Sequence, residues 1–274
     1  MNAIPLILYA GAMVAYGWHF ARRNPMVGRS ATTLLIFGAL AHTFVIGMLT
    51  MELGHIPVTG ATSAISTFVW LLALSYLYTE LTTDERAMGV FILPLIVALQ
   101  AIPAVRPSVE VPADVLRGPL FGVHVSSLLF AYASFALACM IGITYMLQFK
   151  EIKAKHLGFF YTRLPSLQVL DRMNHVAIVI GWIFLTVGIV VGFVWAAQAK
   201  GYAAVSPQVQ AMSVGDPKIL VAIVCWVVYS FELFAARLIG WGGRKTAYLS
   251  LIGFSIVLFN FVAISYFLTK SHNF

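Results

Sequence analysis

Long apolar stretches recur along the whole chain, and they constrain its fold more than any other feature of the sequence. A helix needs about 20 residues to cross the hydrocarbon of a bilayer. Each stretch is about twice as long as a barrel strand and lacks period-two alternation. The sequence therefore predicts an all-α, polytopic integral membrane protein, a single membrane domain over residues 1–274 with eight transmembrane helices. These are expected at 3–21, 31–50, 62–81, 87–104, 121–149, 175–198, 217–238 and 247–269.

The composition excludes an ordinary water-soluble enzyme. Hydrophobic residues make up 61% of the chain and charged residues only 10%, whereas soluble domains carry about 25% charged residues. The net charge of +7 does not indicate nucleic-acid binding, because the basic residues recur between apolar stretches instead of clustering on one segment. We therefore expect membrane lipid as the surroundings of the protein and no nucleic acid as a partner.

The basic residues also predict an orientation. The positive-inside bias places both termini on the extracytoplasmic side, the loop 150–174 in the cytoplasm, and 104–120 and 199–216 outside. Arg22 and Arg23 follow the first stretch, whereas a cleaved signal has its charge before it, so we expect a retained span. The residues assigned to the cytoplasmic side are Arg22, Arg23, Arg29, Arg86, Lys150, Lys153, Lys155, Arg163, Arg172, Arg237, Arg244 and Lys245.

The two cysteines, Cys139 and Cys225, both lie inside apolar stretches and form no CxxC pair. They are expected to behave as small core residues. This pattern excludes a thiol-redox transporter that works through a cysteine pair. Because no CxxCH motif occurs, the chain is not itself a c-type cytochrome.

Three histidines are candidate ligands. His124 begins the fifth span and His272 follows the eighth, so both imidazoles would lie at the outer face. Together they could bind a metal or a haem iron, or each could be an interfacial residue in contact with water. His42 lies roughly 12 Å from the outer end of the second span. A neutral imidazole bonded to a hydroxyl and an axial ligand explain that position equally well. The others, His19, His55, His156 and His175, are expected to be solvated or interfacial.

Other residues near the predicted spans also have two explanations. Trp195 and Tyr202 fit an interfacial aromatic belt, and each also offers a flat apolar face for a porphyrin. Asp216 can cap a helix whose first turn holds Pro217. Glu232, in the seventh span, is expected to pair with an arginine such as Arg237. A transporter that uses Glu232 as a proton relay is a third, weaker functional hypothesis.

Several segments, in their order and spacing, resemble the cytochrome c assembly family, the CcsA/HemX-type membrane proteins that handle haem. GHIPVTG and the Trp-containing helix after it (54–80) are similar to the family's loop and third span. The stretch that begins HVSS (124–148) resembles its histidine-led helix. Residues 164–196 resemble the stretch that leads from the cytoplasmic loop to a haem-facing tryptophan. DPK followed by Trp, Tyr, Arg and GGRK (216–254) and the ending SHNF resemble the last spans and the closing histidine.

The resemblance implies a helical bundle in a bacterial-type inner (cytoplasmic) membrane that holds haem b at its outer face. His124 and His272 would be the axial ligands, and His42 would match a histidine in an early membrane helix. Trp195, Tyr202 and Asp216 complete the implied haem-binding set. The implied partners are a CcsB/ResB-type protein and apocytochrome c. The chain would act within a haem lyase (cytochrome c synthase) system, since it carries no catalytic motif of its own.

The chain departs from the family pattern at two places. It has no tryptophan between Trp195 and Asp216, where the family has a Trp-rich motif. Phe234 or Ala235 stands where a second membrane histidine is expected. These departures motivate an alternative hypothesis, which is a HemX-like accessory or regulatory protein, or a structural subunit of a larger membrane complex, with a degenerate haem site.

Overall fold

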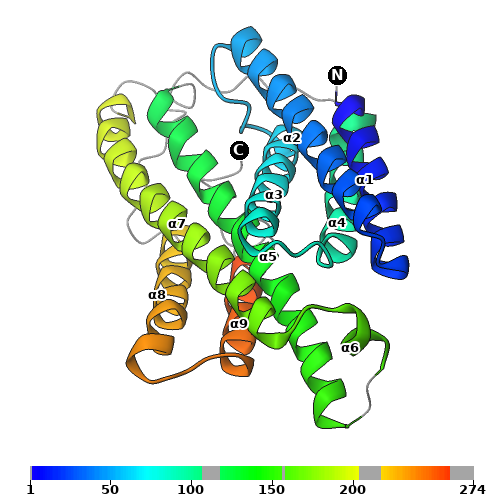
Figure 1. Ribbon diagram of the computed structural model, residues 1–274. Coiled ribbons are helices and arrows are strands. Elements are labelled where there is room, and N and C mark those ends of the chain that lie inside the picture. The colour runs from blue at the N-terminus through cyan, green and yellow to red at the C-terminus, as the bar shows by residue number, and fades with distance from the viewer. Residues whose placement is uncertain (1, 107–117, 156–157, 204–216, 260–274) are drawn as a thin grey trace.

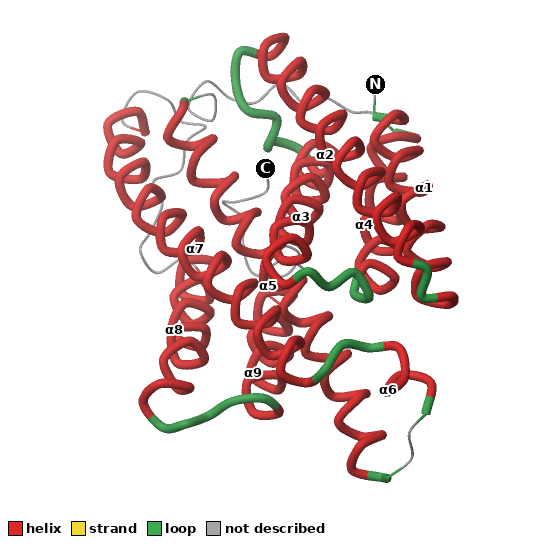
Figure 2. The backbone as a smooth tube through the Cα atoms, viewed as in Figure 1, coloured by secondary structure: helices red, strands yellow, loops and turns green. Residues whose placement is uncertain are grey.

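The computed structural model describes residues 2–106, 118–155, 158–203 and 217–259, and every regular element in these ranges is a helix (Figures 1 and 2). This agrees with the predicted all-α class. The helices are α1 (Ala3–Arg22), α2 (Pro25–Leu53), α3 (Ala61–Thr83), α4 (Gly89–Val105), α5 (Pro119–Lys153), α6 (Phe159–Arg163), α7 (Leu167–Ala203), α8 (Pro217–Leu238) and α9 (Arg244–Phe259).

The helices form two groups that meet at α5. In the first group, α1 packs against α2 and α4, and α3 packs against α4. In the second, α5 runs along α7 and contacts α9, while α8 contacts both α7 and α9. The contact between α3 and α5 joins the groups. Figure 1 shows α5 and α7 as the long central pair, with α1–α4 on one side and α8 and α9 beside their lower halves.

Each predicted span overlaps one helix, but α2, α5 and α7 are longer than expected. The predicted cytoplasmic loop 150–174 contains the last turn of α5, the short helix α6 and the first turns of α7. The first turns of α7 are helical because Leu170 and Met173 there are fully buried. Charged residues next to them lower the mean hydropathy of this segment. The predicted span therefore begins only at residue 175. The last predicted span, 247–269, extends beyond the described part of α9.

The turns α1–α2, α3–α4, α5–α7 and α8–α9 all lie on the lower side in Figure 1. We call this side the basic face, because these turns and the adjacent helix ends carry Arg22, Arg23, Arg29, Arg86, Lys150, Lys153, Lys155, Arg163, Arg172, Arg244 and Lys245. The start of α5 and the end of α7 lie at the opposite face.

The outer surface of the helices is apolar, as a membrane protein requires. Within the described ranges, five helices are long and apolar enough to cross a bilayer, and α4 and the segment Ile219–Ala235 are shorter apolar helices. Large side chains that would be unfavourable in water are exposed on several helices, which makes the chain a multi-pass membrane protein. Examples are Ile7, Val14, Phe37, Phe44, Val190 and Val227.

Three glycines on one face of α7 allow the close approach of α5. A Cβ at Gly181 would collide with the ring of Phe135. At Gly188 it would lie 2.7 Å from a methyl carbon of Leu128, and at Gly192 it would contact the ring of His124. Small residues commonly bring membrane helices together in this way, because lipid chains are as apolar as the helix surfaces themselves. The packing of α5 on α7 therefore depends on the absence of these side chains.

We expect Gly181→Ala to destabilise the protein by about 1–3 kcal/mol. The added methyl would meet the ring of Phe135, which cannot move aside because it stacks on Tyr229 with a centroid separation of 3.5 Å. Unfolding in detergent micelles measures the change. Gly47→Ala is the matched control, since open space surrounds that helical glycine. Equal stability of the two variants would contradict the proposed tight α5–α7 contact.

Candidate functional site

His124 lies in the first turns of α5, at the face opposite the basic face. Its Nδ1 atom donates a hydrogen bond to the backbone carbonyl of Gly188 on α7, at 2.7 Å. A neutral imidazole that donates through Nδ1 carries its lone pair on Nε2. The carbonyl thus selects the tautomer whose lone pair lies on Nε2, an orientation that is common among ligand histidines.

The indole of Trp195 packs beside the imidazole of His124. The two rings are nearly parallel, at 14° and 6.3 Å between centroids, and Phe121 packs on the same indole at 5.2 Å. Gly192 leaves room for the imidazole, because a Cβ there would lie 2.6 Å from Nδ1. Trp195 is only 9% exposed. Its ring therefore supports the histidine and offers little area to anything else.

The other predicted residues of the outer site cannot be placed. His272 and Asp216 lie outside the described residues, and the side chain of Tyr202, near the end of α7, does too. Among the described residues, no group of three or more His, Cys, Asp and Glu side chains could hold a metal ion. The described part of the predicted site is therefore His124 with its support from α7.

His42 lies away from this site, inside the α1–α4 group. Its side chain is completely buried. Nε2 lies 3.0 Å from the Ser66 hydroxyl on α3, and Nδ1 lies 3.3 Å from the Tyr9 hydroxyl on α1. Of the two explanations considered for His42, the hydroxyl-bonded imidazole is the one that this geometry supports. His42 joins three helices.

His55 differs from its expectation, because it was predicted to be solvated or interfacial and is buried. The residues from His55 to Gly60, between α2 and α3, fold inward, and Ile56 next to it packs against the start of α5 at Gly122. The Nδ1 atom of His55 donates a hydrogen bond to the backbone carbonyl of Ile56 at 3.0 Å. Sequence reasoning placed the loop outside the membrane and could not detect that it covers α5.

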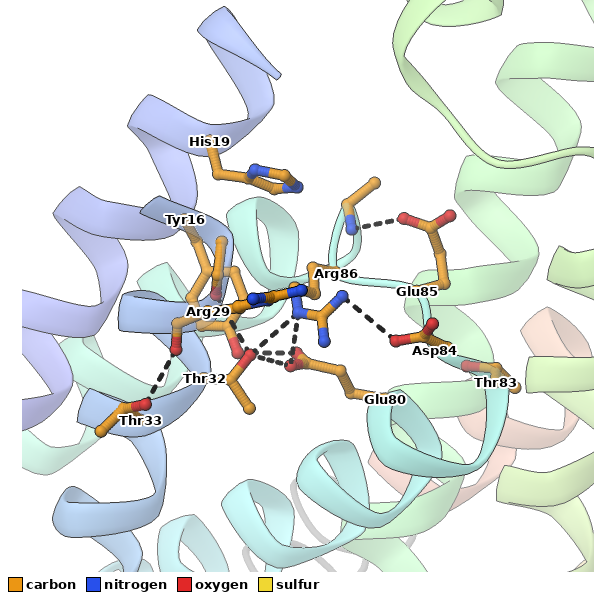
Figure 3. A network of polar contacts seen from close by, with 12 residues as sticks. Tyr16, His19, Arg29, Thr32, Thr33, Glu80, Thr83, Asp84, Glu85 and Arg86 are labelled. Carbon is orange, nitrogen blue, oxygen red and sulfur yellow. Dashed lines mark hydrogen bonds and ion pairs between the residues drawn. The ribbon is translucent and has the colours of Figure 1, made fainter. Parts of the chain in front are cut away.

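A buried carboxylate that the sequence analysis missed lies at the basic face (Figure 3). Glu80, near the end of α3, accepts hydrogen bonds from the hydroxyls of Tyr16 at 2.6 Å and Thr32 at 2.5 Å. Arg86 Nε donates to Thr32 Oγ1 at 3.2 Å and lies 4.0 Å from Glu80 Oε1. Arg86 also forms an ion pair with Asp84 at 3.2 Å. The cluster ties α1, α2 and α3 together at one end.

A signal for this cluster was present in the sequence. An acid within a predicted span must be paired or protonated, and Glu80 lies in the span 62–81 with Arg86 six residues later. The hydroxyl donors from α1 and α2 could not be found from spacing, because they come from other helices.

Glu232 forms a hydrogen bond with α9. Its Oε1 accepts a hydrogen bond from Ser250 Oγ on α9 at 2.6 Å. The expected partner Arg237 has a side chain outside the described residues. The described hydrogen bond of Glu232 is thus with a hydroxyl, and the expected pair with Arg237 stays a prediction.

Comparison with known proteins decides the family. A family model described as "Cytochrome C assembly protein" matches residues 5–272. The chain belongs to the cytochrome c assembly protein family. It is similar to the cytochrome c biogenesis protein CcsA of Guillardia theta, with 24% identity over 84% of this chain and 80% of the relative. It is also similar to protein HemX of Bacillus subtilis (strain 168), with 25% identity over 95% of this chain and 92% of the relative. This confirms the resemblance stated from the sequence.

Removing the Glu80 carboxylate tests the cluster at the basic face. Glu80→Ala would leave the Tyr16 and Thr32 hydroxyls without their acceptor, and we expect a loss of about 3 kcal/mol in the free energy of unfolding. Glu80→Gln retains one acceptor oxygen and should cost less. Glu52→Ala, at an exposed glutamate of α2, is the control and should change stability by less than about 0.5 kcal/mol. Unfolding in micelles that shows no difference between Glu80→Ala and this control would contradict the role given to Glu80.

Proposed function

We propose that this protein takes part in the biogenesis of c-type cytochromes and holds haem b at the face opposite the basic face. The family and the CcsA relatives support the first part of this proposal. The orientation of His124 supports the second, and it is the observation that carries the haem assignment. When bound, haem would supply an iron that accepts imidazole ligands and vinyl groups that react with the thiols of an apocytochrome.

The described residues fit one axial position of haem. His124 has its tautomer set by the Gly188 carbonyl, its ring plane set by Trp195, and its space provided by Gly192. In this assignment His272 is the second axial ligand. Tyr202 and Asp216 remain proposed neighbours of the haem.

The geometry assigns Trp195 a supporting role. Its indole lies nearly parallel to the His124 ring and is buried, so it would help to hold the histidine that would bind the iron. We therefore propose that Trp195 orients the ligand. We propose His42 as a tie between helices, because chain hydroxyls lie near both of its nitrogens.

In the proposed system the chain is the haem-presenting component of a haem lyase and supplies no catalytic group of its own. A CcsB/ResB-type protein and apocytochrome c are the proposed partners. The bacterial-type cytoplasmic membrane is the proposed location.

The proposal is tested by the absorption spectrum of the full-length protein, purified in mild detergent and supplied with haem. The unmodified protein should show the Soret band of a six-coordinate haem. His124→Ala should lose most of it. Gly192→Ala should weaken it, because the added methyl displaces the imidazole. Gly47→Ala is the control and should keep the band.

The same variants should be compared in cells that lack the native copy. Holocytochrome c should fall with His124→Ala and stay normal with Gly47→Ala. A protein that stays colourless with added haem, or a His124→Ala variant with an unchanged spectrum, would reject the haem assignment. Normal holocytochrome c in the absence of the protein would reject the role in biogenesis.

An accessory or structural role without haem is the second candidate. It is favoured by the missing tryptophans between Trp195 and Asp216, and the HemX relative matches over nearly the full length of both chains. In that case partner proteins should co-purify with His124→Ala, and this variant should support full cytochrome assembly.

We also propose that the basic face is cytoplasmic and that eight spans of one membrane domain place both termini outside. The segregation of basic residues supports this orientation. Alkaline phosphatase, which is active only outside the cytoplasm, should be active when fused to either terminus and inactive when fused after Lys155. The opposite pattern would invert the topology.

A further inference from the structure

A second buried polar cluster joins α7, α8 and α9. Glu232 on α8 is 2% exposed, and its Oε1 accepts a hydrogen bond from Ser250 on α9. Ser250 in turn accepts one from the Asn174 amide on α7, at 2.9 Å. One carboxyl oxygen is therefore held by a chain of bonds through two neighbouring helices.

The other carboxyl oxygen has no such bond. Glu232 Oε2 and the hydroxyl of Tyr229, one helical turn earlier on α8, are both buried without a hydrogen-bond partner among the described residues. Glu80 shows the contrast, because each of its oxygens accepts a hydroxyl and a guanidinium lies nearby. A buried polar atom without a partner calls for an explanation, such as an ordered water, a bound ion or a functional role.

The groups that face Glu232 provide no described cation to balance its charge. They are Asp171 and Asn174 on α7, Tyr229 and Cys225 on α8, Cys139 on α5 beyond Tyr229, and Thr246 and Ser250 on α9. A carboxylate among apolar side chains takes up a proton unless a cation pairs with it.

Oxygen atoms connect this site to the basic face. Asp171, in the first turns of α7, is partly exposed. Its Oδ1 accepts hydrogen bonds from Gly243 N at 3.0 Å and from Thr246 Oγ1 at 3.2 Å. Ser250, one turn later on α9, has its hydroxyl 3.2 Å from the backbone carbonyl of Thr246 and 2.6 Å from Glu232 Oε1. Polar groups thus lead from the solvent edge to a carboxyl group within the apolar part of the bundle.

We propose that Glu232 is a proton-binding site that exchanges its proton with the solution at the basic face, on the side where Asp171, Thr246 and Ser250 lie. One proton taken from that solution converts the carboxylate to a carboxylic acid, and its release reverses the change; no other covalent bond changes. Because the carboxyl group joins α8 to α9 and α7, proton uptake alters the contact that holds these helices together. The proposal is independent of haem binding.

Infrared difference spectroscopy of the full-length protein in micelles tests the site. The carbonyl stretch of a protonated carboxylic acid is resolved from the amide bands. Its intensity should change reversibly in the unmodified protein between about pH 5 and pH 10. Glu232→Gln should abolish this change, whereas Glu80→Gln, at the other buried glutamate, should retain it. Asp171→Asn should slow the response to a pH jump roughly tenfold or more, because it removes the proton acceptor at the entrance.

A second variant allows the proposal to be tested even if the Glu232→Gln protein does not fold. Ser250→Ala removes the donor to Oε1 and should shift the frequency of the same band. The proposal is overturned if no band titrates, if the titrating band survives in Glu232→Gln, or if Ser250→Ala leaves its frequency unchanged. A band that responds to sodium at constant pH would also overturn it, by identifying a metal cation as the ligand.

Discussion

The close approach of α5 and α7 is the constraint on which the rest of the structure depends. Within a bilayer the hydrophobic effect does not drive helices together, so van der Waals packing and hydrogen bonds must do so. Gly181, Gly188 and Gly192 give α7 a face without side chains, against which α5 lies. The same absence of side chains exposes the Gly188 carbonyl to His124. The packing contact and the orientation of the candidate ligand therefore have one cause.

The buried carboxyl groups of Glu80 and Glu232 have different surroundings. In the α1–α4 group, His42 has a hydroxyl near each of its nitrogens, and Glu80 accepts a hydroxyl on each oxygen. These groups act as interhelical ties, since hydrogen-bonded polar side chains stabilise a fixed arrangement. In the α7–α9 group, Glu232 and Tyr229 retain polar atoms without a described partner. Glu80 is thus a tie between helices and Glu232 is the proposed proton site, while the buried Gln100 amide on α4 also lacks a described partner.

Much of the fold could be predicted because hydropathy is a local property. The predicted spans overlap helices, and the resemblance to the cytochrome c assembly family is confirmed by the family match. The errors arose because hydropathy was averaged over many residues and because some contacts join residues that are far apart in the chain. Averaged hydropathy did not reveal the single acid Glu80 within an apolar span. It also did not predict the helical start of α7, where charged residues occur. The burial of His55 depends on a contact between its loop and α5.

The sequence by itself determined the membrane class, the approximate helices, the grouping of basic residues and the family, because each follows from residue types along the chain. Only the tertiary structure decided which nitrogen of His124 carries the lone pair, that Trp195 supports the imidazole, and that Glu232 contacts Ser250. These depend on contacts between helices far apart in sequence. Their directions follow from how the helices pack against one another, which residue spacing within a single helix does not specify.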